Sequence, residues 1–299
     1  MKLIHQENID KERWDKLVLS DQGASIYCQS VFLDSLAENW SLLVDDNYSC
    51  GLPVPFTIRL GVKGVYTPNF IRTVDWVGLT ENNRLETISK AESILKKNFK
   101  LASLRMLENH FSRSNSEWVF QELVGEIKLN SQAKRSCKKF QKSDLIIERV
   151  ELNDVLSIVS EELTDKVTSL RSIDIERFES FLRAYPKAQI HVFGTKRKDV
   201  ILGGLIFIQW KNTFHYVKGG ARKEAKDQGA MYAMMELAIN HALSQGMKID
   251  FGGSNVKGVQ QFNAAFGGVD VPYFEWKWDN SPFWFKSLKA LKNKRNSSN

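Results

Sequence analysis

The chain has 299 residues, of which 42% are hydrophobic and 26% are charged, and these proportions exclude a disordered or fibrous protein. Its formal charge of +7 favours anionic partners such as phosphorylated cofactors or nucleic acid. The N-terminus has no apolar signal segment, no apolar run is long enough to span a bilayer, and the three cysteines are scattered. We therefore expect a cytoplasmic protein with no membrane span and no disulfide framework.

The first part of the chain is predicted to alternate short helices with strands. The turn-forming run Asp45-Asp46-Asn47 indicates a hairpin, and Leu85, Ile88 and Leu95 mark a helix by their spacing. In chain order we expect helices at 9–20 and 31–37, the hairpin at 40–58, a strand pair at 62–76, the helix around 85–95, and strands at 101–107 and 117–124.

A basic helix at 131–142 is the expected joint between two halves of the chain, since no Pro-, Gly- or Ser-rich linker separates them. We therefore predict domains at 1–130 and 131–299. The helix carries one group of cations, Lys134, Arg135, Lys138, Lys139 and Lys142. These cations favour either phosphate binding or a solvated helix face. After it we expect a strand at 145–150, helices at 152–166 and 174–185, and strands at 189–195, 200–209 and 213–218.

The stretch 212–268 is the most informative part of the sequence. The strand N-T-F-H-Y-V-K places Phe214 and Tyr216 on one face, and His215 and Val217 on the other. A long apolar helix and a short strand follow, and a strand–helix–strand unit this compact predicts a parallel crossover. Its glycines stand where a backbone can approach a ligand, beside a helix N-terminus that favours anions.

The run D-F-G-G-S-N-V-K-G-V-Q-Q-F-N-A-A-F-G-G at 250–268 is similar to the C-terminal signature of FemAB-like acyltransferases. These proteins belong to the GNAT superfamily and usually carry two such domains in tandem. The preceding Y-V-K-G-G-A, the Q-G-A helix start, the basic helix and the segment I-Y-C-Q-S-V-F-L-D-S-L extend the resemblance over most of the chain. It implies an α/β fold of two GNAT-like domains with mixed, mostly antiparallel sheets.

The resemblance also implies that the C-terminal domain binds acyl-CoA as the donor substrate. The pantetheine arm would lie between the strands ending at Gly219 and Phe251, and the pyrophosphate would meet backbone N–H groups at 228–231. A plain strand–helix turn is the alternative explanation of these glycines. The predicted donor-binding residues are Gly219, Gly220, Gln228, Gly229, Ala230 and Phe251.

Two proton donors familiar from the superfamily are absent. The position of a tyrosine found in many GNAT enzymes is Phe262 here, and the position of a lysine found in FemAB-like enzymes is Asn263. We predict that Asp250 acts as the base and that Asn263 binds a substrate carbonyl, with Tyr216 within reach. The alternatives are a turn-forming aspartate and a polar cap at a helix end. His215 and Tyr232 are the other titratable candidates, and no metal-ligand spacing is present.

The expected function is N-acyl transfer from acyl-CoA to a small-molecule or peptide amine. An aminoacyl-tRNA-dependent transfer of the FemAB type is the alternative within the same class. Loss of both familiar donors favours a catalytically inactive binding protein of the GNAT fold, and the basic segments favour a nucleic-acid-binding module. The sequence leaves the acceptor and the oligomeric state open.

Overall fold

The computed structural model describes residues 1–108, 110, 114–166, 170–253 and 257–297. The chain forms two compact units, and unit 2 is the continuous segment Trp118–Pro272. Unit 1 combines Met1–Glu117 with Tyr273–Asn299. This division differs from the predicted boundary at 130/131, because strands β6 (Ser114–Leu123) and β12 (Val269–Asp279) each begin in one unit and end in the other.

Unit 1 is an α/β unit whose strands follow the order β1-β2-β3-β4-β5-β12. All of these neighbours pair antiparallel except β4 and β5, which are parallel. Short 3-10 helices lie at Gln6–Asn8, Ile26–Cys28 and Glu81–Asn83. In chain order the elements are β1 (Lys2–His5), α1 (Lys11–Ser20), α2 (Ser30–Leu36), β2 (Asn39–Val44), β3 (Gly51–Arg59), β4 (Val62–Tyr66), α3 (Arg84–Asn98), β5 (Leu101–Met106), the end of β12, and α10 (Phe283–Ser297).

Local sequence accounts for much of unit 1. Asp10 caps α1 by accepting a hydrogen bond from the backbone N–H of Arg13, and Trp14 is fully buried beneath the helix. The predicted hairpin is present as β2 and β3. The predicted strand pair at 62–76 is wrong, because only β4 is a strand there. Residues 67–80 instead bind β5 through separate backbone and side-chain hydrogen bonds rather than a continuous ladder.

Unit 2 has the strand order β6-β11-β10-β9-β8-β7, with β10 and β11 parallel and the other neighbours antiparallel. The basic helix and both helices predicted after it are present. A 3-10 helix lies at Lys187–Gln189. The elements are α4 (Ser131–Gln141), β7 (Ile146–Arg149), α5 (Leu152–Lys166), α6 (Ser172–Ala184), β8 (Ile190–Arg197), β9 (Val200–Trp210), β10 (Thr213–Ala221), α7 (Lys223–Asp227), α8 (Ala230–Ser244), β11 (Lys248–Gly253) and α9 (Lys257–Ala264).

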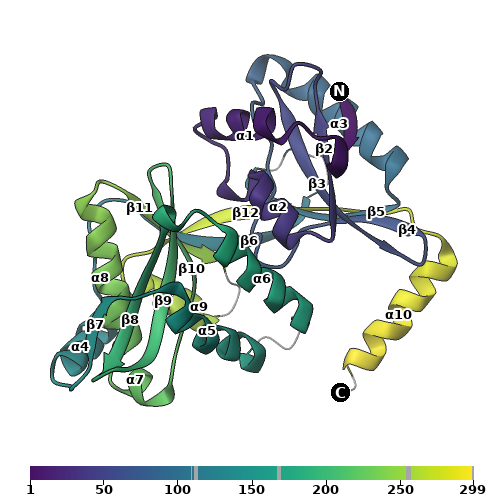
Figure 1. Cartoon of the computed structure of the whole chain (residues 1–299). Helices are drawn as coiled ribbons and strands as arrows, with labels where there is room; N and C mark the ends of the chain where they lie inside the picture. Colours follow the sequence, from purple (N-terminus) through teal and green to yellow (C-terminus); the bar gives the residue numbers. More distant parts are fainter. Residues whose placement is uncertain (109, 111–113, 167–169, 254–256, 298–299) are drawn as a thin grey trace. The chain divides into compact units, whose positions relative to one another are not determined.

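Helices cover both faces of the sheet in unit 2 (Figure 1). Helix α8 packs its buried stripe, which includes Met234 and Ala238, against Phe207 and Phe214 of the strands. Helix α4 packs on α8 on this side, while α5 crosses the opposite face above β9 and β10. We refer to these as the α8 face and the α5 face.

The two units repeat one succession of elements. Each runs strand, helix, helix, three strands, helix and strand, from β1 to β5 in unit 1 and from β7 to β11 in unit 2, with α7 added in unit 2. In each unit the parallel pair joins the strand before the long helix to the strand after it. The structure is therefore the mixed, mostly antiparallel α/β fold that was predicted.

Candidate functional site

A histidine–carboxylate pair stands where the parallel pairing of β10 with β11 ends. His215 and Asp250 are the last paired residues, and His215 Nδ1 lies 3.1 Å from Asp250 Oδ2. Asp250 is buried, and its Oδ1 accepts a hydrogen bond of 2.8 Å from the backbone N–H of Gly252. The backbone therefore fixes the carboxylate, and the carboxylate fixes the imidazole. The sequence named both residues separately, and the structure brings them together.

The second nitrogen of His215 is available for proton transfer. Its Nε2 is buried and has no hydrogen-bond partner within the described ranges of the chain. When a carboxylate accepts from Nδ1–H, the neutral imidazole holds its lone pair on Nε2. This arrangement lets Nε2 take a proton while Asp250 stabilises the resulting imidazolium. The geometry thus places the Asp250 carboxylate against Nδ1 of His215 and leaves Nε2 without a partner among the described residues.

Lys218 lies on the same face and was missed by the sequence analysis. Strict alternation would place it with Phe214 and Tyr216, but the register of β10 shifts between Tyr216 and Lys218. Because His215 pairs with Ile208 and Lys218 with Ile206, the bulge brings the lysine to the α5 face. Burial lowers the pKa of the Lys218 ammonium, which has no ion-pair partner among the described residues.

Tyr216 points to the α8 face. Its ring centroid lies 5.3 Å from that of Phe207, and a Cβ on Gly219 would lie 2.8 Å from its hydroxyl oxygen. Burial raises the pKa of the Tyr216 phenol above its usual value. The phenol therefore stays protonated at neutral pH, where it can donate a hydrogen bond but does not act as a base.

Asn263 belongs to a buried chain of amides. Its Nδ2 donates to Gln121 Oε1 at 2.9 Å, and Gln121 Nε2 donates to Asp270 Oδ1 at 2.7 Å. These bonds tie α9 to β6 and β12. The Oδ1 atom of Asn263 is buried and has no partner within the described residues. A lysine at this position would bury an ammonium beside Gln121, so the change from the family's lysine has a clear structural consequence.

The predicted phosphate loop is closed by packing. The backbone N–H groups of Gln228 and Gly229 donate to Ala225 and Lys226 at the end of α7. Gly229 has φ +82°, and a Cβ there would lie 2.3 Å from the carbonyl oxygen of Ser136 in α4. Because glycine has no side chain, α4 can pack directly against the backbone at Gly229. Two of the four N–H groups assigned to phosphate are already bonded within the chain.

The other predicted donor residues also take part in packing. A Cβ on Gly220 would lie 2.8 Å from Glu162 Cγ of α5, and Ala230 is fully buried in the core of α8. Phe251 is buried, with its ring stacked 6.3 Å from that of Phe266. Phe262 lies edge-on to Tyr232 at 4.9 Å. These contacts explain why glycines and aromatics recur here without requiring a ligand.

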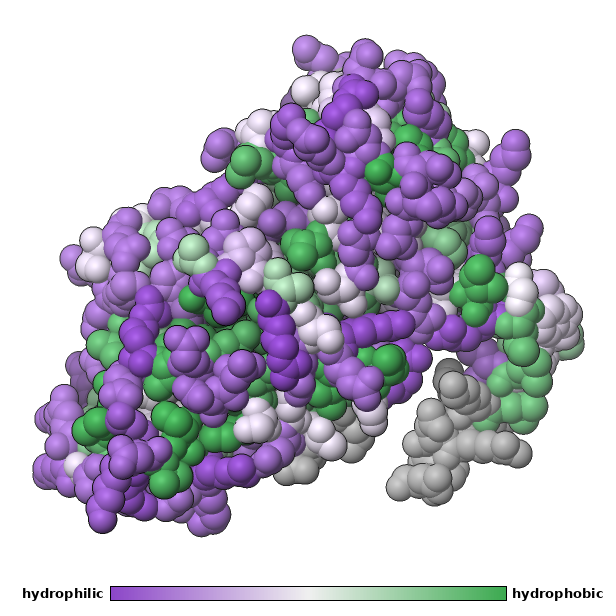
Figure 2. Space-filling view, in the orientation of Figure 1, coloured by the Kyte–Doolittle hydropathy of each residue, from purple (hydrophilic) through white to green (hydrophobic). Residues whose placement is uncertain are grey.

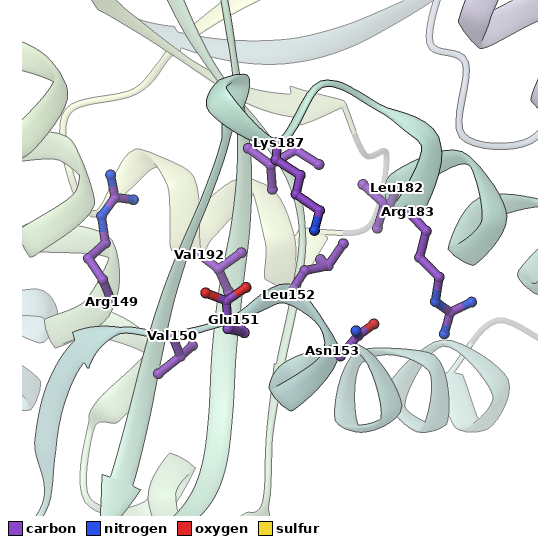
Figure 3. Close-up of a pocket in the computed structure, with 10 residues that line it drawn as sticks. Arg149, Val150, Glu151, Leu152, Asn153, Leu182, Arg183, Lys187 and Val192 are labelled. Carbon is purple, nitrogen blue, oxygen red and sulfur yellow. The ribbon is translucent and has the colours of Figure 1, made fainter.

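The α5 face also holds a pocket of about 560 Å³, a size typical of small-molecule sites. Ile190 and Val192 of its wall pair with Ile208 and Ile206, so the wall shares the face of His215. Figure 3 shows Lys187 and Arg183 on one side of Glu151, while Arg149 points away. The lining residues are Arg149, Val150, Glu151, Leu152, Asn153, Leu182, Arg183, Lys187, Ile190 and Val192.

No group of His, Cys, Asp and Glu side chains in the described residues has the geometry of a metal site. Among the helices of the described ranges, none has the length and apolar character needed to cross a bilayer.

Comparisons with known proteins agree with this architecture. Residues 151–262 match the family model for the acetyltransferase (GNAT) domain. No curated protein matches the sequence. FemX aligns with a TM-score of 0.62 and 12% identity, over 92% of this chain and 97% of that chain.

Two further solved structures align over nearly their whole length. A conserved protein of unknown function from Bacteroides thetaiotaomicron gives a TM-score of 0.59 at 11% identity, covering 92% of this chain and 99% of that one. L-PGS from Bacillus licheniformis gives 0.57 at 11% identity, covering 95% and 96%. The GNAT fold and the likeness to FemAB-like proteins that the signature predicted are therefore confirmed, and the chain has the fold of a GNAT acyltransferase.

Proposed function

We propose that the protein transfers an acyl group from an activated donor to an amine, with His215 as the general base. The buried His215–Asp250 pair at the end of the parallel strands is the observation that carries this proposal. A GNAT fold with a positioned base at this point can accept the proton of an attacking amine. Such a base typically contributes about 10²–10⁴-fold to the rate.

The steps balance with the groups present. The amine nitrogen attacks the acyl carbonyl, a C–N bond forms, and the bond from the acyl carbon to the donor's sulfur or oxygen breaks. His215 Nε2 takes the amine proton, which passes to the leaving group. The partly desolvated Lys218 lies on the same α5 face as His215 and can supply positive charge to the developing oxyanion or leaving group, whereas Tyr216 points to the opposite face.

Acyl-CoA is the first donor to test, since GNAT domains typically use it. Gly229, however, packs on α4, and the N–H groups of Gln228 and Gly229 bond within the chain. The loop at 228–229 therefore does not fit the expected pyrophosphate cradle, and CoA phosphates would have to be held by other groups.

Aminoacyl-tRNA is the second candidate donor, and the surface of α4 favours it. Residues 131–142 contain no acidic residue, and Ala133, Cys137 and Phe140 turn inward. The five cations of this segment are all exposed, and none forms an ion pair with a carboxylate among the described residues; they are Lys134, Arg135, Lys138, Lys139 and Lys142. A row of exposed cations suits a nucleic-acid backbone.

The pocket on the α5 face supports a small-molecule or peptide amine as the acceptor. Its wall is two strands from His215, or about 10 Å at ~4.8 Å per strand spacing. An acceptor seated there extends along the same face as the base. The lining holds Arg149, Arg183 and Lys187 against one carboxylate, Glu151, so it favours an acceptor that carries an anionic group besides its amine.

A thermal-shift panel tests the donor. Acetyl-CoA, longer acyl-CoAs, free CoA and aminoacyl-tRNA are added in turn, and the true donor raises the melting temperature because it binds only the folded chain. We expect tRNA binding, if it occurs, to weaken steeply with salt and to weaken further in Lys134→Ala/Lys138→Ala. If no acyl donor binds, the transfer chemistry is overturned and the non-catalytic binding protein replaces it.

A further inference from the structure

The last helix, α10 (Phe283–Ser297), exposes an apolar stripe. Trp284, Leu288 and Leu291 are 48%, 48% and 60% exposed, and Phe283 is 86% exposed. The spacings of four and three residues place Trp284, Leu288 and Leu291 on one side of the helix. Figure 2 shows hydrophobic surface along this end of the chain. Large apolar side chains grouped in this way mark an interaction surface.

Local hydrogen bonds join the start of the helix to the end of β12. Ser281 donates its backbone N–H to Asp279 Oδ1, and Lys286 Nζ donates to the Asp279 carbonyl at 3.1 Å. The backbone N–H of Phe285 donates to Pro282, and the Phe285 side chain is half-buried. The exposed fractions of Trp284, Leu288 and Leu291 show that the described residues leave this side of the helix largely uncovered.

The charge of the segment identifies the surface that it fits. Residues 283–297 contain five cations and no acidic residue: Lys286, Lys289, Lys292, Lys294 and Arg295. A helix that combines exposed Trp, Phe and Leu with lysines is suited to the interface of an anionic membrane. At ~1.5 Å per residue it is about 22 Å long, too short to span the bilayer core. We propose that α10 lies on an anionic lipid surface and holds the protein there.

Vesicle co-sedimentation of the full chain tests this proposal. We expect binding to vesicles of phosphatidylcholine with phosphatidylglycerol, little binding to phosphatidylcholine alone, and loss of binding at high salt, which screens the lysines. Trp284→Ser/Leu288→Ser should reduce the bound fraction at least about tenfold, because it removes the apolar half of the contact. The unfolding transition should change little, since about half of each of these residues is exposed.

Leu85→Ser is the matched control. Leu85 is 87% exposed on α3, in the same unit, and its loss should leave vesicle binding unchanged. The proposal is overturned if the double variant binds anionic vesicles as well as the wild type, or if the wild type does not bind them. A concentration-dependent dimer that the double variant abolishes would assign the stripe to a second copy of the chain instead. This test is independent of the transfer chemistry, because it measures no turnover.

Discussion

The parallel strands of unit 1 and unit 2 carry different residues at the same position. In unit 2 the third and last pair is His215 with Asp250, while in unit 1 it is Tyr66 with Ser103. The Tyr66 hydroxyl accepts a hydrogen bond from the backbone of Glu38, and Ser103 donates to Glu275 at 2.5 Å. Both side chains of unit 1 are thus committed to structure, whereas His215 Nε2 is not bonded within the described residues.

The chain beyond these pairs differs as well. In unit 1 the loop after β4 binds β5: Val74 donates its backbone N–H to Arg105, and the Asp75 carboxyl accepts from the N–H of Leu107. In unit 2 the segment after β10 forms α7, and Gly229, which follows α7, packs against Ser136 of α4. The same arrangement of elements therefore has two outcomes. In unit 1 the loop after β4 covers the end of the parallel strands, whereas in unit 2 that position carries the His215–Asp250 pair.

The largest expected effect is on the pair itself. Asp250→Asn should leave the fold intact and lower turnover by about 10²–10⁴-fold, because the imidazole loses its tautomer and its counter-charge. His215→Asn should do the same. Steady-state rates with the donor found in the thermal-shift panel measure both.

Ser103→Ala at the matching position of unit 1 is the control for the pair. It should leave turnover unchanged, because Ser103 bonds to Glu275. If Ser103→Ala lowered turnover as much as Asp250→Asn does, the proposed functional difference between the two units would be wrong.

Gly229→Ala should destabilise the protein by about 3 kcal/mol. The substitution places a side chain at φ +82° and against the carbonyl of Ser136. Gly246→Ala is a matched control, since φ there is +72° with no atom within 4 Å of the added Cβ. It should cost about 1 kcal/mol. Denaturant unfolding compares the two, and equal losses would show that α4 does not pack as described.

Asp75 makes the closed loop of unit 1 sensitive to pH. Burial raises the pKa of the Asp75 carboxyl from 3.8 to about 6. Because the folded pKa is above the unfolded one, its contribution to stability is complete below about pH 4 and is lost as pH rises through about 6. From pH 7 to 4.5 the wild type should gain about 2 kcal/mol over Asp75→Asn. The prediction is contradicted if the free energy of unfolding changes equally for the wild type and for Asp75→Asn between pH 7 and pH 4.5.

The smallest expected effect concerns Lys218. Lys218→Met removes a desolvated ammonium and should stabilise the fold by about 1 kcal/mol. The same change should lower turnover by about tenfold if the ammonium stabilises developing charge. Opposite signs in the two measurements distinguish a functional lysine from a structural one. A loss of both stability and activity would assign Lys218 to packing.

Sequence periodicity predicted the regular elements well. Helix α5 has the predicted bounds, and the hairpin of β2 and β3 follows the turn at Asp45–Asn47, because local patterns dominate where a segment has one apolar face. The aromatics at 66–76 suggested strands, but that segment is buried by tertiary hydrogen bonds that no local pattern encodes. Strand β12 lies beyond the recognised signature and was not predicted.

The candidate site was predictable in part. Asp250, His215 and Tyr216 were identified from their places at strand ends, but their pairing depends on the register of β10 with β11, which spacing does not give. The register shift after Tyr216 places Lys218 on the α5 face, whereas strict alternation predicts the α8 face. The glycine at 229 correctly predicted that another group lies close to the backbone there. The sequence alone does not show whether that group is a ligand or, as in the structure, helix α4.

Unit 1 is built from two segments of the chain that are separated by unit 2, and this order affects folding during synthesis. Unit 1 begins with β1, but the strand that pairs with β5 is β12, whose residues up to Asp279 come after all of unit 2. A segment that is synthesised earlier normally folds before one that is synthesised later. Here unit 2 can complete its sheet while the β5 edge of unit 1 still lacks its neighbour. The nascent chain therefore keeps the β5 edge unpaired until β12 has been synthesised.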